Sequence, residues 1–334
     1  MVEDILKVNL NVDEELTIKR NVLRPMSGDC GNTDVAAVAT EAQTGCLRPK
    51  ATGGGRAVIV TGIHGDELEG QYICYNLIRK ITANMANLTG TVEIYPSINP
   101  LGMESVSRAF PMTGLDMNRV FPGTQVGSIA ENIARAVVES IKGADICVDI
   151  HASNIFIREI PQVRIRPENS DRLMRYAKML NTDMVWVHES GAVGSGSLAE
   201  SLIAEDVPTL VVEMGVGQRI DREYCDQLLH GIFNLLNHLG IWAEEEHGIS
   251  HPMVSSDGSV NVIHSSGSGI FIPCVEHNMW LAKGTLIGEI VTPITGTVEQ
   301  EITAPVDGVI FSLREYPIVY EGSVIARMLS MNQS

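Results

Sequence analysis

Between residues 57 and 240 the sequence alternates short apolar runs with longer amphipathic segments. The runs predict strands over 57–62, 91–96, 145–150, 184–187 and 208–214, and the amphipathic segments predict helices over 67–82, 128–141, 169–180, 196–205 and 221–239. Such alternation is typical of an α/β domain with a mixed, mostly parallel central sheet flanked by helices. Ligands of such sheets bind beyond the carboxyl ends of the strands, so we expect functional residues there.

The two ends of the chain follow different patterns. Residues 1–50 contain two short apolar runs and then a polar stretch rich in Gly, Ala and Thr, which predict a β-rich lead-in and a long loop. After residue 258, short β runs separated by Gly, Pro or Asp predict a small C-terminal all-β domain. We therefore expect a first domain over 1–248 and a second over 249–334.

The chain of 334 residues has a formal net charge of −17. This charge argues against a nucleic-acid binder, because phosphate contacts need a basic face. The N-terminus lacks a signal-peptide pattern, and no run approaches the roughly 18 apolar residues of a membrane span, so we expect a soluble, cytoplasmic protein with no membrane partner. Six cysteines without close pairs are expected to be free thiols: Cys30, Cys46, Cys74, Cys147, Cys225 and Cys274.

A histidine and a glutamate lie where the first of these strands turns into a helix. His64 and Glu67 are three residues apart, so on a helical turn their side chains share a face and can bind one metal ion. Taken alone, such a pair is more often an ordinary helix start with surface acids. A metal site therefore needs a third ligand. The neighbouring acids Asp66 and Glu69 are assigned no role.

The third ligand expected is His151, which follows the apolar run 145–150. Two imidazoles and one carboxylate leave the fourth position of a tetrahedral zinc site open, as in catalytic sites. Asp149 points to the same side of the strand and would orient a ligand. A histidine that caps a helix or lies in a loop is the alternative for His151.

A zinc hydrolase also needs a base that takes a proton from water and delivers it to the leaving nitrogen. Glu213 ends the apolar run 208–212 and precedes a Gly-rich turn. Burying a carboxylate there for a purely structural purpose is costly, which favours a catalytic role. A glutamate bonded to backbone amides is the alternative.

Positive charge is expected from the long connection over 97–127, in which no clear element is predicted. Arg108, Asn118 and Arg119 lie in it. A guanidinium suits a substrate carboxylate, and one near the metal can stabilise an oxyanion. A solvated loop arginine is the alternative for Arg108. Roles for His188 and Arg219 stay open.

The order of these residues resembles that of the zinc carboxypeptidase superfamily and, more closely, that of the succinylglutamate desuccinylase/aspartoacylase family of zinc amidohydrolases. The stretches that carry the resemblance are 62–67 (GIHGDE), 99–100 (NP), 116–123 (DMNRVFPG), 149–151 (DIH) and 213–215 (EMG). No single motif is decisive, but five in the family's order make a specific signal. The resemblance implies a zinc-carboxypeptidase-like fold, with one zinc ion per chain on His64, Glu67 and His151 and with Glu213 as general base and acid.

The same resemblance implies roles for the cationic residues. Arg108 would polarise the scissile carbonyl, and Asn118 with Arg119 would hold the free carboxylate of the substrate. The C-terminal β domain would shape the mouth of the site. It resembles half of a biotinyl/lipoyl-type barrel-sandwich hybrid, but Thr297 stands where a carrier has its lysine, so a carrier function is rejected.

The leading hypothesis is a zinc-dependent deacylase that hydrolyses the amide bond of an N-acyl amino acid or a similar small amide bearing a carboxylate. A metallocarboxypeptidase acting on short peptides is the alternative, since the same residues would serve both. A non-catalytic binding protein of the same fold is a third hypothesis. The sequence identifies neither the acyl group nor the amino acid, and a homo-oligomer stays open.

Overall fold

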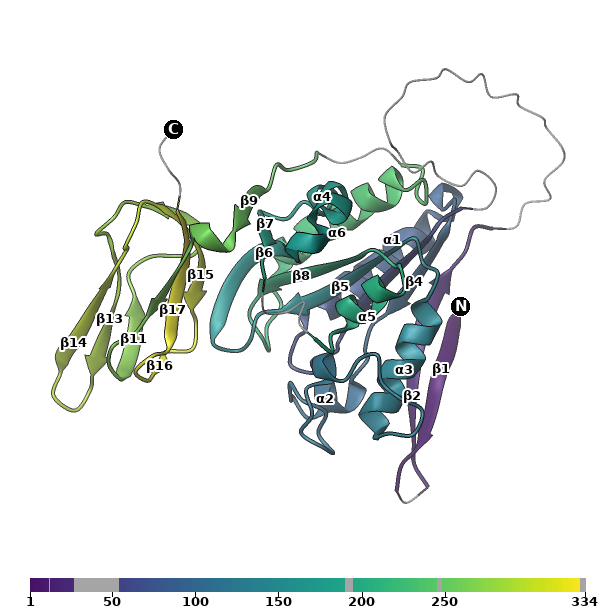
Figure 1. Ribbon diagram of the computed structural model, residues 1–334, viewed down its shortest axis with the longest axis horizontal. Helices are drawn as coiled ribbons and strands as arrows, with labels where there is room; N and C mark the ends of the chain where they lie inside the picture. Colours follow the sequence, from purple (N-terminus) through teal and green to yellow (C-terminus); the bar gives the residue numbers. More distant parts are fainter. Residues whose placement is uncertain (12, 27–53, 190–194, 245–247, 331–334) are drawn as a thin grey trace.

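The computed structural model describes residues 1–11, 13–26, 54–189, 195–244 and 248–330 (Figure 1). Most of the long loop predicted after the lead-in lies outside the described residues, as do Cys30 and Cys46. The four described cysteines are free thiols, as predicted. Within the described part of the chain, no helix is both long and apolar enough to cross a membrane.

The large sheet is mixed and has a parallel centre. Its path is β1-β2-β4-β3-β5-β8-β6-β15-β17-β10. The first strands along the chain are β1 (Val2–Asn9), β2 (Glu15–Leu23), β3 (Arg56–Thr61), β4 (Thr91–Tyr95), β5 (Ile146–Ala152), β6 (Ile157–Ile165), β7 (Met184–Val187), β8 (Thr209–Gly215) and β9 (Met253–Ser256). The pairs β4–β3, β3–β5 and β5–β8 are parallel, whereas β2–β4 and β8–β6 are antiparallel. The predicted mixed, mostly parallel sheet is confirmed.

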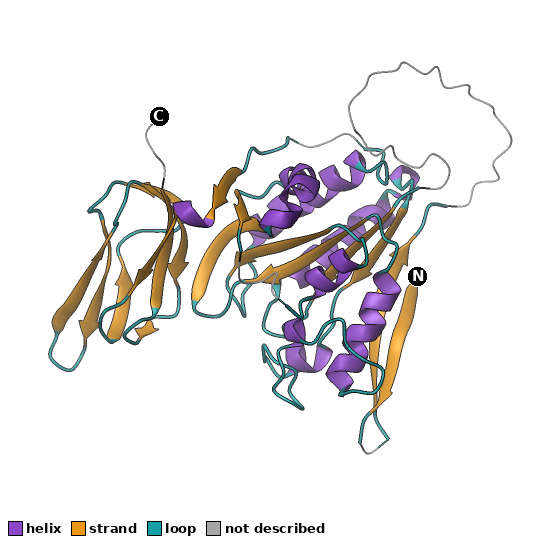
Figure 2. Ribbon diagram, viewed as in Figure 1, coloured by secondary structure: helices purple, strands orange, loops and turns teal. Residues whose placement is uncertain are grey.

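Helices cover both faces of this sheet (Figure 2). The helices are α1 (Glu69–Ala83), α2 (Pro100–Glu104), α3 (Ile129–Ile141), α4 (Ser170–Ala177), α5 (Leu198–Ala204) and α6 (Arg222–His238). Apolar residues of α1, α4 and α6 form one core with β5 and β8, and those of α3 and α5 form a second core with β3. The alternating pattern of the sequence thus gives an α/β fold in three layers.

A C-terminal β region continues the large sheet. Its strands are β10 (Val260–His264), β11 (Gly269–Pro273), β12 (Met279–Leu281), β13 (Leu286–Thr292), β14 (Thr297–Thr303), β15 (Gly308–Arg314), β16 (Ile318–Val319) and β17 (Val324–Ser330). A separate antiparallel sheet has the order β14-β13-β11-β16, while β15 pairs with β6 and so joins the α/β region. The all-β C-terminal region is as predicted. The boundary at 248/249 and the barrel-sandwich likeness stay predictions.

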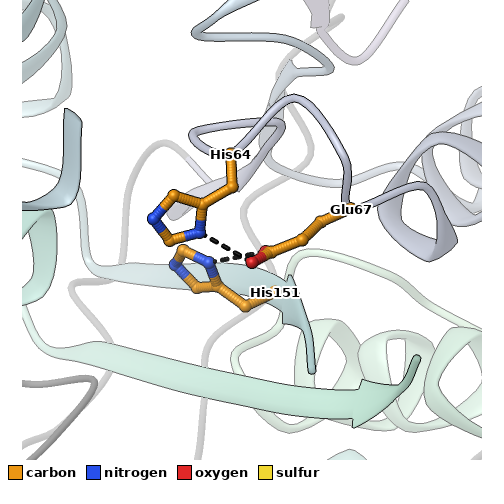
Figure 3. Close-up of side chains that lie close together, drawn as sticks. All are labelled: His64, Glu67 and His151. Atoms are coloured by element: carbon orange, nitrogen blue, oxygen red, sulfur yellow. Dashed lines mark hydrogen bonds and ion pairs between the residues drawn. The ribbon is translucent and has the colours of Figure 1, made fainter. Parts of the chain in front are cut away.

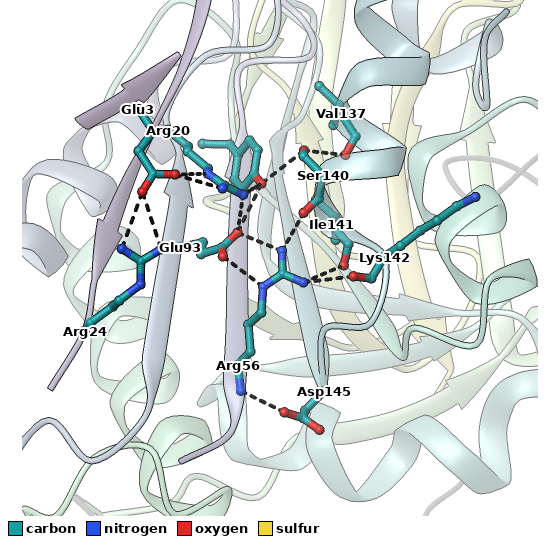
Figure 4. Close-up of polar contacts among 11 residues, drawn as sticks. Glu3, Arg20, Arg24, Arg56, Glu93, Val137, Ser140, Ile141, Lys142 and Asp145 are labelled. Carbon is teal, nitrogen blue, oxygen red and sulfur yellow. Dashed lines mark hydrogen bonds and ion pairs between the residues drawn. The ribbon is translucent and has the colours of Figure 1, made fainter. Parts of the chain in front are cut away.

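A partly buried ion cluster around the buried Glu93 holds the strand that leads to His64. Arg56 of β3 forks onto Glu93 of β4, with Nε–Oε1 and Nη2–Oε2 distances of 2.9 Å (Figure 4). Its Nη1 also donates to the carbonyl oxygen of Lys142, at the end of α3. Arg20 of β2 approaches the same Glu93 carboxylate at 2.9 Å. Because a bidentate guanidinium satisfies a carboxylate that would be costly to bury alone, the cluster locks three strands and α3 together.

Candidate active site

His64 and Glu67 lie in the connection between β3 and α1. Since α1 begins at Glu69, the two residues lie in the loop before the helix, and the prediction that they share its first turn is wrong. The path of the connection depends on glycine, because a Cβ on Gly65 would stand only 2.0 Å from the backbone of Gly102 in α2. The loop is therefore pressed against α2, which holds both side chains in place.

His151 lies at the end of β5 and meets the loop pair (Figure 3). The Glu67 carboxylate lies between the two imidazoles, with Oε1 2.7 Å from His64 Nδ1 and Oε2 2.9 Å from His151 Nδ1. One ligand atom from each residue lies within 4.8 Å of the other two, and all three residues are buried. The structure thus brings together the three residues predicted as metal ligands.

The donor set fits a zinc ion. Two imidazole nitrogens and one carboxylate oxygen lie close together, which is the ligand set of open catalytic zinc sites. Burial acts to raise the pKa of Glu67, but the imidazoles of His64 and His151 outweigh it and hold that pKa well below its usual range.

Carboxylates stand behind both imidazoles. The Nε2 atom of His64 lies 3.0 Å from Asp116 Oδ1, a hydrogen bond that presents Nδ1 to the metal position. Asp149 Oδ2 lies 3.2 Å from His151 Nε2, but the two groups are not aligned as a hydrogen bond. The predicted orienting role of Asp149 therefore has support from proximity only. Asp116 begins the motif over 116–123, but the sequence analysis gave it no role.

Glu213 lies on β8 directly opposite His151 on the neighbouring strand β5. Residues opposite one another in adjacent strands point to the same face, so Glu213 faces the side on which the ligands meet. Its carboxylate is buried, and burial raises its pKa above the ordinary glutamate value. Among the described residues its polar contact is with Arg164, at 3.5 Å, and no backbone amide donates to it.

Arg108 approaches the ligand cluster from its exposed edge. The guanidinium Nη1 donates to Glu67 Oε1 at 3.0 Å, and Nη2 lies 3.6 Å from Asp116 Oδ2. It is therefore not a free loop arginine, since it contacts the carboxylate of Glu67, a predicted metal ligand. Its side chain remains 43% exposed, so solvent and a small molecule can reach it.

Asn118 and Arg119 lie in the short 3₁₀ turn Met117–Arg119 within the long connection. The buried Asn118 accepts a hydrogen bond from the backbone N–H of Leu198 at 3.0 Å, at the start of α5. The exposed Arg119 donates to the Asn118 carbonyl oxygen at 2.7 Å. The connection, predicted without elements, also contains α2. The carboxylate-binding role of the two residues stays a prediction.

Strand β6 supplies polar groups beside Glu213 that the sequence analysis missed. Gln162 lies opposite Glu213, so His151, Glu213 and Gln162 form one row across β5, β8 and β6. Within the described residues the fully buried Gln162 amide has no hydrogen-bond partner. Arg164 and Glu159 of the same strand form an ion pair at 2.8 Å. Strand β6 was not predicted from the sequence, because these polar side chains interrupt the apolar run by which buried strands were identified.

Glu69 has a role that was also not foreseen. Its buried carboxylate accepts the backbone N–H of Val216 at 3.2 Å, which ties the start of α1 to the turn after Glu213. Burial raises the pKa of Glu69 to about 8. The roles of His188 and Arg219 were left open by the sequence analysis. His188 Nδ1 lies 2.5 Å from Asp257 Oδ1. Arg219 donates to the Gln218 carbonyl oxygen at 2.9 Å.

The chain matches known proteins in sequence and fold. The profile described as "Succinylglutamate desuccinylase/Aspartoacylase catalytic domain" matches residues 53–239. N-alpha-acetyl-L-2,4-diaminobutyric acid deacetylase from Halomonas elongata is 25% identical over 291 residues, which cover 84% of each protein.

Solved structures share the whole fold. The product-bound ectoine utilization protein EutE from Ruegeria pomeroyi has a TM-score of 0.78 at 20% identity, with 99% of this chain and 95% of that chain covered. A succinylglutamate desuccinylase/aspartoacylase from Rhodobacter sphaeroides has a TM-score of 0.76 at 20% identity, with 100% and 96% covered. The profile covers more than half of the chain, which therefore belongs to the succinylglutamate desuccinylase/aspartoacylase family and is an amidohydrolase.

Proposed function

We propose that the protein is a zinc-dependent deacylase that cleaves the amide bond of an N-acyl amino acid. The observation that carries this proposal is the convergence of His64, Glu67 and His151 with Glu213 opposite His151 on the next strand. The Halomonas relative, whose name describes removal of an acetyl group from an N-acetylated amino acid, supports this substrate class.

His64, Glu67 and His151 would hold the metal. When bound, zinc supplies a Lewis acid that polarises the substrate carbonyl and makes water more acidic. Glu213, whose pKa is raised by burial, would take a proton from the attacking water and deliver it to the departing nitrogen. A raised pKa suits this role, because it makes the carboxylate a stronger base toward the water.

The cationic residues would bind and polarise the substrate. Arg108 is held beside Glu67 and would donate to the carbonyl oxygen as negative charge develops there. Asn118 and the exposed Arg119 would hold the carboxylate of the amino acid. The partner is thus a small molecule, while the cytoplasmic location stays a prediction.

A substrate screen tests the proposal. Zinc-loaded protein is offered acetyl-, succinyl- and other acyl-amino acids beside dipeptides of the same amino acids, with product amine measured before and after chelation. We expect turnover of acyl-amino acids that chelation abolishes. Faster cleavage of dipeptides would favour a metallocarboxypeptidase. A protein that binds no zinc and cleaves neither class would be a binding protein.

A further inference from the structure

A row of four charged side chains connects Glu213 to the C-terminal strands. Arg164 Nη1 lies 3.5 Å from Glu213 Oε1, and its Nη2 lies 2.8 Å from Glu159 Oε2. The other oxygen of Glu159 lies 2.5 Å from Nη1 of Arg327. Glu213 and Arg164 belong to β8 and β6, whereas Arg327 belongs to β17. The charges alternate in sign along the row.

We propose that Arg164 is a positioning residue for Glu213, and that Glu159 and Arg327 hold Arg164 in place, so that the C-terminal β region takes part in ordering the catalytic base. This inference rests on the proposed function, in which Glu213 is the base. Under this proposal the C-terminal strands help to orient the catalytic base, in addition to shaping the mouth of the site.

The burial of the row makes each member dependent on the next. The side chains of Glu159 and Arg164 are only 2% and 13% exposed, and that of Glu213 is 11% exposed. A buried charge is tolerated only when an opposite charge compensates it. Glu159 is compensated on both sides, by Arg164 and by Arg327. Loss of Arg327 would therefore leave Glu159 with Arg164 alone and draw that guanidinium away from Glu213.

The contact between Arg164 and Glu213 can orient the Glu213 carboxylate and still leave it able to accept a proton. Arg164 approaches one carboxylate oxygen, Oε1, at the long end of hydrogen-bond distance, while its shorter and stronger contact is with Glu159. Arg164 is thus fixed by a partner other than the base. The second oxygen of Glu213 accepts no hydrogen bond from Arg164, which would leave it for water.

The strand register aligns the Arg327 and Glu159 end of the row across the sheet, whereas Arg164 lies opposite Val211 and Glu213 opposite Gln162. Glu159 lies opposite Ser312 of β15 on one side and Gly215 of β8 on the other, and Arg327 lies opposite Ser312. The hydrogen-bonded ladders of four strands therefore carry the row from Arg327 to the strand that bears Glu213. The geometry of the row therefore depends on the pairing of β15 with β6, which we call the seam between the α/β region and the C-terminal β region.

Turnover by variants of the zinc-loaded full chain tests the proposal. We expect Arg164→Lys, whose single ammonium nitrogen cannot replace both Nη1 and Nη2, and Arg327→Gln to lower kcat by about 10- to 100-fold with KM within about twofold and zinc content unchanged. Arg327→Lys keeps a cation on Glu159 and should retain most of kcat. Arg314→Gln is the matched control, because Arg314 lies at the same seam but donates to the carbonyl oxygens of Tyr316 and Ile318.

A kcat at the wild-type level in both Arg164→Lys and Arg327→Gln would overturn the proposal. So would an equal loss in Arg314→Gln, since that would indicate a general effect on the seam. If no substrate is turned over by the wild type, the proposed function has failed, and the row is tested without substrate. In urea unfolding, Glu159→Gln and Arg327→Gln together should lower the midpoint by less than the sum of the single changes. Additive losses would show that the row is not coupled.

Discussion

Glu213 and His151 lie directly opposite one another on the parallel strands β8 and β5. The imidazole proposed to bind the metal and the proposed base are therefore fixed by the ladder of a buried sheet and not by a loop. A carboxylate on this face would lie beside a bound metal without being one of its three proposed ligands. The separation of ligand and base between two strands is what allows their roles to be tested independently.

Replacement of Glu213 by Gln should abolish turnover without loss of the metal. Glutamine has the same shape but cannot accept and return the proton, so we expect kcat to fall by at least ~100-fold. Zinc content, measured by atomic absorption on the same preparation, should equal that of the wild type. Unchanged kcat would remove Glu213 from the mechanism, and loss of zinc would make it part of the metal site.

Replacement of Asp116 by Asn should weaken zinc binding. The Asp116 carboxylate orients His64 from behind, and such groups typically contribute about 10- to 100-fold in metal affinity. Competition with a chromophoric chelator gives the dissociation constant. Asp257→Asn is the control, because Asp257 pairs with His188 instead of a metal ligand. Equal affinities of Asp116→Asn and wild type would contradict the assigned orientation.

Replacement of Gly65 by Ala should destabilise the protein and distort the metal site. The added Cβ would meet the Gly102 backbone at 2.0 Å, and forced overpacking costs about 1–3 kcal/mol or more in unfolding free energy. Gly258→Ala, which meets no atom within 4 Å, should unfold like the wild type. Urea unfolding and zinc affinity are the measurements. A Gly65→Ala protein equal to the wild type in both would show that the loop is not pressed against α2.

Glu69 should make the wild type lose stability as pH rises. Burial raises its pKa from 4.5 to about 8, so the folded protein keeps a proton that the unfolded chain releases. Its contribution is complete below about pH 4.5 and is lost as pH rises toward 8, at about 1.4 kcal/mol per pH unit. Glu69→Gln, which still accepts from Val216, lacks this loss. The unfolding free energy of Glu69→Gln relative to that of the wild type should therefore increase as pH rises from 5 to 8. A difference that stays constant over this range would contradict the raised pKa of Glu69.

The regular elements and the ligand residues could be predicted from sequence because each has a local signal. Apolar runs ended by His151 and Glu213 correspond to β5 and β8, and the predicted α3 over 128–141 matches Ile129–Ile141. Their convergence follows from the rule that parallel strands present their carboxyl ends at one edge of the sheet. The His64–Glu67 pair was foreseen, although on a helix instead of in the loop before it.

The residues behind the site could not be predicted in this way. Strand β6 is buried but carries Arg158, Glu159, Gln162 and Arg164, so it has no apolar run to mark it. Its charges are tolerated because partners on other strands compensate them, and Arg327 is far away in the sequence. Such pairing is a property of the tertiary fold, which no local pattern encodes.

The central claim is that His64, Glu67 and His151 hold a zinc ion required for amide hydrolysis, and a zinc titration of turnover tests it most directly. Metal is removed with a chelator, zinc is returned in steps, and the rate is measured on the acyl-amino acid preferred in the screen, with His151→Ala alongside. We predict no turnover in the metal-free protein, a linear rise that ends at one zinc per chain, and no recovery in the variant. Full turnover without metal, or equal recovery in His151→Ala, would contradict the account.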